Sequence, residues 1–253
     1  EYAYALTAHA ILWAAGREPE LNLRFEVKEK LAAMDGGALT VFIENTGKTA
    51  MAGRMSARIA DGYSTTLSEI TRDVSATPGR SHQEFKLVPL PSGSYVADVW
   101  LKDREGRIIN WASTSFRVRG DVSFEETKFD RDLYSEGDAV RLKVKLRFNP
   151  AFKDDLAIRW ELFGGNSENR MVGRGKASFE VLEAGVGISL IEARTVRPVE
   201  RFREFRLIAE RNGKPVAQTR TGVFVKPMPR PGWFHAIGYG RMGTDLHYYS
   251  RSA

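Results

Sequence analysis

The chain has 253 residues, of which 42% are hydrophobic and 28% charged, a composition typical of a globular protein. Its formal net charge of +6 arises from 38 Lys and Arg interleaved with 32 Asp and Glu, so we expect no concentrated basic face and no nucleic-acid partner. The absence of cysteine excludes disulfides, thiolate metal sites and cysteine nucleophiles, and no run of 18 apolar residues predicts a membrane span.

Residues 1–19 are predicted to form a helix. In "EYAYALTAHAILWAAGREPE", Tyr2, Leu6 and Trp13 recur at helical spacing, and Gly16 followed by Pro19 indicates the end of the helix. A signal-peptide remnant is the alternative, although no basic leader precedes the apolar stretch. Because the chain starts at Glu1, we interpret it as an excerpt or a processed chain, and this helix as the last one of a preceding domain.

Residues 20–118 show the period of two that is typical of β-strands. "ALTVFIEN" alternates, and "SGSYVADVWLKDREGRIINWASTSFRV" contains one strand, a turn at residues 103–106 and a return strand that ends at Val118. The predicted inward side chains are those of Leu39, Val41, Ile43, Tyr95, Ala97, Val99 and Leu101. Strands of this length without a long helical pattern predict a β-sandwich.

A second β-sandwich is predicted for residues 119–226, joined to the first near residues 119–122. "AVRLKVKLRF" and "AIRWEL" alternate cleanly, with inward Val140, Leu142, Val144, Leu146, Phe148, Ile158, Trp160 and Leu162. The hairpin at residues 103–118 matches the one at residues 210–225 in length and turn position. The sequence therefore predicts an all-β protein with two tandem sandwiches, a short N-terminal helix and a C-terminal extension at residues 227–253.

The central region lacks the residue sets that catalysis requires. His82 is the one histidine between residues 20 and 227, and we interpret it as a surface residue. Asp154–Asp155 and Glu125–Glu126 are adjacent pairs, which on strands would point to opposite faces and could not act as an acid and base pair. We expect no catalytic residue, no metal site and no cofactor in this chain.

Two further segments allow two interpretations each. "GGNSENRMVGRG" at residues 164–175 is glycine-rich and is interpreted as a loop between strands, with a ligand-binding loop as the alternative. "RTVRPVERFREFR" at residues 194–206 is the densest basic run, but Glu200 and Glu204 interrupt it. We interpret this run as a solvated strand surface, and a contact with an anion or polymer is the alternative.

Trp100 is the most prominent surface candidate, because its position is out of phase with the inward set of its strand. An outward tryptophan, here with Trp111 as a second candidate, can cover a neighbouring domain, stack on a sugar ring or belong to a local core. Two residues of the C-terminal stretch, Trp233 and Tyr239, join Trp100 as candidate substrate-binding residues.

The first part of the chain resembles known families in two segments. "YALTAHAILWAAGREPE", residues 4–20, resembles the last helix of class I glutamine-amidotransferase-like domains, which in bacterial carbohydrate-active proteins precedes β-sandwiches. "LTVFIENTGKTAMAGRMSARIADGYS" and "LVPLPSGSYVADVWLKDREGRI" resemble an immunoglobulin-like accessory module. "FDRDLYSEGDAVRLKVKL" is similar to the strand entry of macroglobulin-like modules. These resemblances imply two immunoglobulin-like sandwiches.

The end of the chain, "PGWFHAIGYGRMGTDLHYYSR", resembles the entry to the catalytic barrel of β-galactosidase-like glycoside hydrolases. The resemblance implies a first barrel strand at residues 234–240 and a following helix with Thr244 as its N-cap. The paired catalytic glutamates of that family would lie beyond Ala253. An extension packed on the second sandwich is the alternative interpretation of this stretch.

Together these resemblances imply the non-catalytic β-sandwich region of a multidomain glycoside hydrolase-like protein. Its partners would be the flanking domains of the same polypeptide and polysaccharide, and its location would be periplasmic or secreted. The alternative is a free-standing module that binds polysaccharide or a protein partner.

Overall fold

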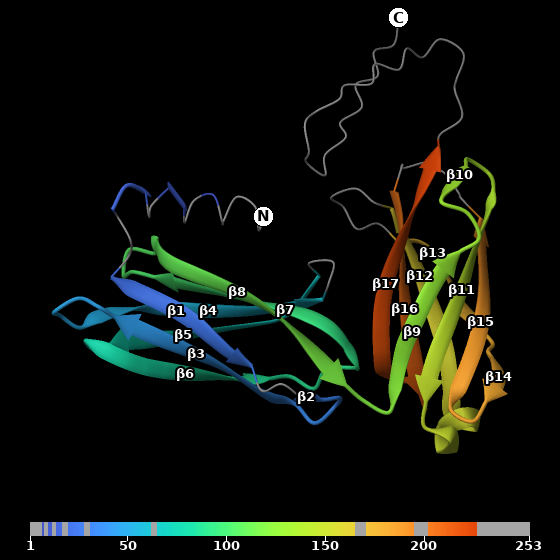
Figure 1. Cartoon of the computed structure of the whole chain (residues 1–253), viewed down its shortest axis with the longest axis horizontal. Coiled ribbons are helices and arrows are strands. Elements are labelled where there is room, and N and C mark those ends of the chain that lie inside the picture. The colour runs from blue at the N-terminus through green and yellow to red at the C-terminus, as the bar shows by residue number, and fades with distance from the viewer. Residues whose placement is uncertain are drawn as a thin grey trace, which may run out of the picture.

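The computed structural model describes residues 7, 10–11, 14–16, 20–27, 31–61, 65–164, 171–194 and 202–226. Over these residues the protein is all-β, with two β-sandwiches in tandem (Figure 1). Helical backbone is described at Thr7, Ala10, Ile11 and Ala14, ahead of the first strand. No helix in the described part of the chain is long and apolar enough to span a membrane.

The first sandwich consists of a three-stranded and a five-stranded sheet. The smaller sheet has the order β1 (Leu21–Val27), β3 (Gly37–Asn45), β6 (Gly79–Leu87). The larger has the order β2 (Leu31–Ala32), β8 (Ile108–Arg119), β7 (Gly93–Lys102), β4 (Met51–Asp61), β5 (Thr66–Ala76). The predicted core residues Leu39, Val41, Val99 and Leu101 are buried between the two sheets.

The second sandwich consists of a four-stranded and a five-stranded sheet. The first has the order β14 (Glu180–Glu183), β15 (Val186–Arg194), β11 (Ala139–Phe148), β9 (Val122–Phe129). The second has the order β10 (Leu133–Ser135), β17 (Lys214–Lys226), β16 (Phe202–Arg211), β12 (Leu156–Gly164), β13 (Met171–Ala177). Val140, Leu142 and Val144 are fully buried here, and Trp160 packs against this core from a half-buried position.

The two apolar clusters do not share residues: one spans Leu21 to Val118 and the other Val122 to Val225. Only Gly120 and Asp121 lie between the end of β8 and the start of β9. Strand alternation is confirmed in both sandwiches, since every second residue of β7 and of β11 is buried. Each of these strands therefore contributes one face to its core and presents the other away from it.

The hairpins that close the two sandwiches turn in the predicted places. Gly106, in the β7–β8 turn, has a φ of 83°, and Asn212 and Gly213, in the β16–β17 turn, have φ values of 50° and 75°. Left-handed backbone favours glycine and tolerates asparagine. The glycine at each turn is therefore required by the backbone geometry.

The structure differs from the sequence interpretation in two details. Asp154 and Asp155 lie in a 3-10 helix at Pro150–Asp155 rather than on a strand, because Pro150 is compatible with a helix start and the Asn149 side chain accepts a hydrogen bond from Ala151 N at 3.1 Å. The second half of the glycine-rich segment forms β13, not a loop; residues 165–170 lie outside the described residues. A Cβ at Gly175 would lie 2.7 Å from the Trp160 indole, so the indole can pack against the sheet here because residue 175 has no side chain.

Candidate functional site

The two sandwiches are joined by a short β-bridge as well as by the chain itself. Ser92, just before β7, pairs in parallel with Ala217 of β17. Its backbone N donates to Val216 O at 2.9 Å, and its carbonyl oxygen accepts from Gln218 N, also at 2.9 Å. Ser92 Oγ donates to Val118 O at 3.3 Å, which ties the bridge to the end of β8. One residue of the first sandwich is thus held by main-chain bonds to an edge of the second.

Tyr95 and Gln218 form a second contact between the two sandwiches, in the region around the bridge that we call the joint. Gln218 Nε2 donates to Tyr95 Oη at 3.2 Å, and Tyr95 Oη donates to Pro91 O at 2.7 Å. Burial raises the pKa of Tyr95 to about 12, although the hydrogen bond from Gln218 acts in the opposite direction. The phenol therefore remains protonated, and can keep donating to Pro91 O, over the whole physiological pH range.

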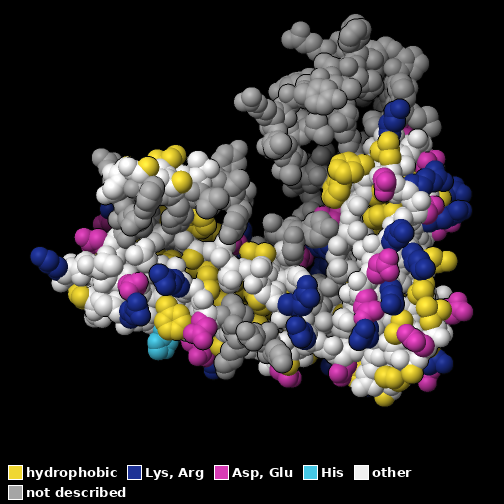
Figure 2. All heavy atoms as spheres, viewed as in Figure 1, with side chains coloured by type: hydrophobic (Ala, Val, Ile, Leu, Met, Phe, Trp, Pro, Cys, Tyr) yellow, Lys and Arg dark blue, Asp and Glu magenta, His cyan; other side chains and the backbone are white. Residues whose placement is uncertain are grey.

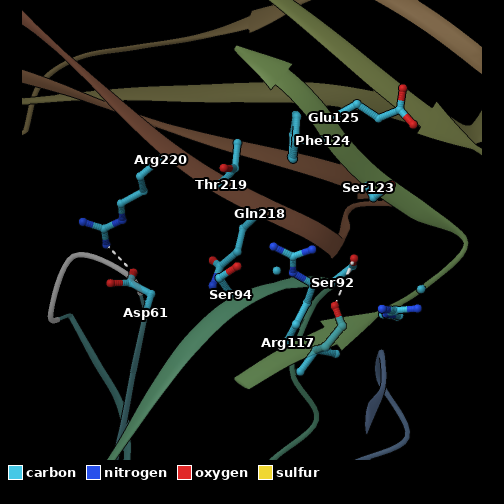
Figure 3. A pocket seen from close by; sticks show the side chains of 14 residues that line it. Asp61, Ser92, Ser94, Arg117, Ser123, Phe124, Glu125, Gln218, Thr219 and Arg220 are labelled. Atoms are coloured by element: carbon cyan, nitrogen blue, oxygen red, sulfur yellow. Dashed lines mark hydrogen bonds and ion pairs between the residues drawn. The ribbon is translucent and has the colours of Figure 1, made fainter. Parts of the chain in front are cut away.

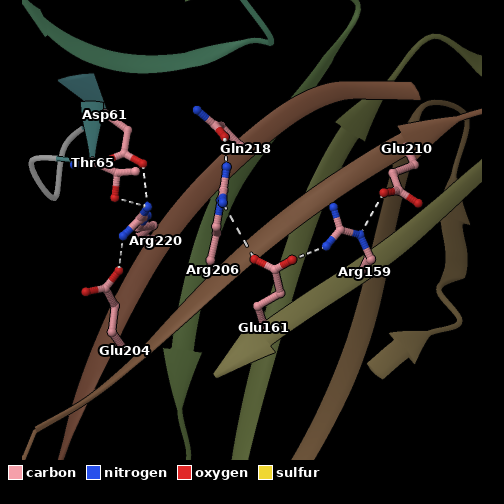
Figure 4. Close-up of polar contacts among 9 residues, drawn as sticks. All are labelled: Asp61, Thr65, Arg159, Glu161, Glu204, Arg206, Glu210, Gln218 and Arg220. Atoms are coloured by element: carbon pink, nitrogen blue, oxygen red, sulfur yellow. Dashed lines mark hydrogen bonds and ion pairs between the residues drawn. The ribbon is translucent and has the colours of Figure 1, made fainter. Parts of the chain in front are cut away.

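Arg220 of β17 forms the most buried ionic contact of the joint (Figure 4). Its Nη2 lies 2.6 Å from Asp61 Oδ2 of β4 and donates to Thr65 Oγ1 at 2.6 Å, while Nη1 lies 2.5 Å from Glu204 Oε1 of β16. The side chains of Arg220, Asp61 and Glu204 are 6%, 5% and 10% exposed. Because Asp61 belongs to the first sandwich and Glu204 to the second, one guanidinium pairs with a carboxylate from each.

A ladder of charged side chains continues from this cluster across β16 and β12 (Figure 4). Arg206 donates to Gln218 Oε1 at 3.3 Å and lies 3.6 Å from Glu161, which also pairs with Arg159. Arg159 Nε lies 2.7 Å from Glu210 Oε1. These residues alternate with buried Phe205, Leu207 and Ala209, so they occupy the sheet face that points away from the core.

This arrangement corrects the interpretation of the basic run at residues 194–206. Residues 202–206 of the run do not form a solvated surface, since Arg203 and Glu204 are buried and Arg206 is largely covered, whereas Arg194 is exposed. A charged side chain can be covered on this sheet face where a carboxylate of the neighbouring strand lies opposite an arginine. Glu161 lies opposite Arg206 in this way in the register of β12 and β16. Residues 195–201 lie outside the described residues.

Two glycines allow close packing at the joint, Gly93 between the two sandwiches and Gly120 between the linker and the first sandwich. A Cβ at Gly93 would lie 3.0 Å from Gln218 O, and a Cβ at Gly120 would lie 2.7 Å from the Ala33 Cβ. Neither distance leaves room for a larger side chain without a shift of the neighbouring backbone or side chain. The geometry of the joint is therefore built into the chain at these two positions as well as at Arg220.

A cleft of about 750 Å³ opens beside the bridge (Figure 3). Its walls come from the first sandwich, through Ser94 and Arg117, and from the second, through Ser123, Phe124 and Thr219. The remaining lining residues are Asp61, Ser92, Gly93, Val118, Arg119, Gly120, Glu125, Gln218 and Arg220. The cleft thus exists only where the two sandwiches meet.

Trp100, predicted from its phase, does lie on the face of β7 that points away from the core, where it is half-buried. Trp111 of β8 is its cross-strand partner. The Arg58 guanidinium lies 5.0 Å from the centre of the Trp100 ring and 2.7 Å from Asp98 Oδ2. The other two predicted residues, Trp233 and Tyr239, lie outside the described residues, so Trp100 is the one candidate whose surroundings are known.

The residues of the joint were not singled out in the sequence. Ser92, Asp61 and Arg220 lie in three separate segments, and nothing in their local patterns indicates that they meet. His82 is exposed on β6, as expected, with its ring centre 6.0 Å from that of Phe42. Among the described residues no cluster of His, Asp and Glu is arranged to hold a metal ion.

No family model and no curated protein sequence matches this chain. Among solved structures, it is similar to red sea bream transglutaminase, with a TM-score of 0.36 and 12% identity over 86% of this chain and 33% of that one. It is also similar to a CARDB domain from Pyrococcus furiosus, solved in complex with di-metal ions, with a TM-score of 0.32 and 18% identity over 40% of this chain and 93% of that one. The chain thus spans about a third of the transglutaminase.

Proposed function

We propose that this chain is a non-catalytic spacer whose two sandwiches are held in one fixed relation, so that domains attached at its two ends keep a defined geometry. The observation that carries the proposal is the buried Arg220 cluster, which joins Asp61 of one sandwich to Glu204 of the other. A change in the relation of the two sandwiches would break the ion pair of Arg220 with Asp61 and its hydrogen bond to Thr65, both from the first sandwich.

The main-chain bridge supports the same function. A parallel bridge at Ser92 and Ala217 fixes both the distance and the direction of β17 relative to the start of β7. The connection between the sandwiches is also short, with two residues between β8 and β9. A flexible linker would require a longer stretch of glycine, serine or proline.

A distance measurement on the whole chain tests this proposal. The chain has no cysteine, so Lys86→Cys on β6 and Leu190→Cys on β15, both exposed and away from the joint, give two unique sites for spin labels. We expect one narrow distance distribution for the doubly labelled protein, and a broader one after Arg220→Ala. A broad distribution in the unsubstituted protein would show that the two sandwiches move independently and would refute the spacer function.

We further propose, from the resemblance of the two ends of the chain, that the spacer belongs to a glycoside hydrolase-like protein outside the cytoplasm. In that protein an amidotransferase-like domain would precede the sandwiches and a catalytic barrel would follow them. The test is to assay aryl glycosides with the protein encoded by the whole gene and with this chain alone. We expect activity from the former and background release from the latter; activity of this chain that a point mutation abolishes would refute the proposal.

The alternative function, direct binding of polysaccharide, is favoured by one observation. Trp100 and Trp111 lie side by side on an outward sheet face, with Arg58 and Asp98 next to them. Aromatic rings beside hydrogen-bonding groups are suited to stacking on sugar rings. Affinity electrophoresis in gels that contain neutral polysaccharides would show retardation that Trp100→Ala removes if this function holds, and no retardation if Trp100 covers a neighbouring domain.

A further inference from the structure

Two arginines at the end of β8 have no acidic partner among the residues that the structure describes. Arg117 and Arg119 are exposed, lie two residues apart and therefore point to the same side of the strand. No carboxylate of the described residues lies within ion-pair distance of either guanidinium, whereas most other arginines near the joint are paired. Both line the cleft between the sandwiches.

Hydroxyl groups surround these two cations. Ser94 is the cross-strand neighbour of Arg117 in the register of β7 and β8, which places the two side chains about 5 Å apart at their Cβ atoms. Ser123 and Thr219 line the cleft from the second sandwich, and Phe124 adds an apolar surface (Figure 3). A ligand in the cleft would thus meet two forked cations, several hydroxyls and one aromatic ring.

The carboxylates of the cleft do not neutralise Arg117 and Arg119, because other cations already engage them. Asp61 pairs with Arg220 at 2.6 Å. Glu125 pairs with Arg147 at 2.5 Å and with Lys145 at 3.4 Å, and the hydrogen bond from Arg147 lowers the pKa of Glu125 below its usual value. The cleft therefore has an excess of two positive charges.

We propose that this cleft binds an acidic oligosaccharide through a carboxylate or sulfate oxyanion. The guanidinium fork matches the two oxygens of such a group, and paired arginines on one strand can hold it in a bidentate manner. The serine and threonine hydroxyls would pair with the hydroxyls of the sugar. The oxyanion part of the proposal stands on Arg117 and Arg119 alone, whereas the oligosaccharide part rests on the proposed function.

Calorimetric titration of the whole chain at low salt tests the site. The probes are tetragalacturonate, a heparin-derived tetrasaccharide, neutral maltotetraose and sodium sulfate. We expect at least one acidic tetrasaccharide to bind and maltotetraose not to bind. Arg117→Ala and Arg119→Ala should each weaken binding roughly tenfold, the usual effect of losing a charge-assisted hydrogen bond. Arg117→Lys should weaken it less, because the charge remains.

Arg104→Ala provides the matched control. Arg104 is also exposed, but it lies past the opposite end of β7, about 30 Å from the cleft at the usual rise per strand residue, so its removal should leave affinity unchanged. Equal affinity of the unsubstituted chain and the Arg117→Ala, Arg119→Ala double variant would refute the site. If sulfate binds as tightly as either tetrasaccharide, the result would support the oxyanion site and refute the proposal that the cleft recognises an oligosaccharide. The spin-label distances of the double variant, expected to stay narrow, keep this result separate from the spacer function.

Discussion

Arg220 shows how much one residue of this protein depends on its surroundings. In sequence it is the one arginine of β17, between Thr219 and Thr221. In the folded chain it lies between Asp61 and Glu204, with both carboxylates nearly covered. Charges buried in this way are stable only as a paired set, since an unpaired buried carboxylate loses its hydration without any compensation.

Arg220→Ala should therefore lower the free energy of unfolding by about 3–5 kcal/mol, the usual cost of leaving a buried charge unpaired. The control is Arg141→Ala, which removes the pair with Glu192, where the side chains are 63% and 59% exposed. That change should cost less than about 1 kcal/mol, because solvent screens such pairs. Urea unfolding followed by circular dichroism measures both. Equal losses in the two variants would show that the Arg220 cluster contributes no more than a surface pair.

Tyr95 gives a prediction about alkaline pH. Burial raises its pKa to about 12 in the folded chain, against about 10 for an unfolded tyrosine. Since the folded state holds this proton more tightly, the stability from Tyr95 is fully present below pH 10 and is lost as the pH rises from about 10 to about 12. Tyr95→Phe, which has no proton to lose, should show a shallower fall in urea-unfolding free energy over this range.

The same variant provides a spectroscopic control. Absorbance titration of phenolate should show one fewer tyrosine of high pKa in Tyr95→Phe than in the unsubstituted chain. Tyr134 should keep its raised pKa in both proteins, because its own burial and its hydrogen bond to Asp130 are unchanged. An unchanged number of late-titrating tyrosines would contradict the assignment of this proton to Tyr95.

At the scale of elements, the strands follow from side-chain alternation and the turns from glycine. β7 and β11 were predicted with the correct inward residues because in each strand buried apolar residues alternate with residues of a more exposed face. β13 was missed because a glycine-rich strand that packs against Trp160 has no apolar alternation to show. The 3-10 helix at Pro150–Asp155 was missed because six residues are too few to show a repeating helical pattern of apolar side chains.

The two closing turns provide a matched pair of substitutions. A Cβ at Gly106 or at Gly213 would meet no atom within 4 Å, so Gly106→Ala and Gly213→Ala add backbone strain without a clash. Each should destabilise its own sandwich by about 1–2 kcal/mol, the cost of left-handed backbone for an alanine. Hydrogen exchange of the β7–β8 and β16–β17 amides would locate the effect. An effect of Gly106→Ala on the second sandwich alone would contradict this assignment.

At the scale of the whole molecule, the relation between the sandwiches depends on close contacts as well as on charge. The two sandwiches lie at a steep angle to each other in Figure 1, and surface charges of both signs are interspersed over them in Figure 2. Apolar packing between the two cores does not provide the joint, since the two clusters of buried residues are separate. Hydrogen bonds, one ionic cluster and the close approach of Gly93 to Gln218 provide it instead.

Gly93→Val should therefore change the shape of the molecule more than its stability. Its Cβ would lie 3.0 Å from Gln218 O, and the added methyls would press the start of β7 away from β17. We expect a broader spin-label distance distribution and a changed small-angle scattering profile. Gly173→Ala is the control, because the new Cβ would meet side-chain atoms at 3.6 Å or more. A scattering profile of Gly93→Val identical to that of the control would show that the joint tolerates the substitution.

The sequence by itself determined the all-β class and the strands that alternate clearly, such as β7 and β11, with their inward faces, because alternation and turn glycines are local signals that depend only on neighbouring residues. It also placed Trp100 on an outward face. Only the tertiary structure decided which polar residues meet. Ser92, Asp61 and Arg220 are brought together by contacts between segments more than a hundred residues apart, and Arg203 and Glu204 are buried although their sequence indicates a solvated strand. Burial of charge depends on the partner that the fold supplies, and that partner leaves no trace in the local pattern.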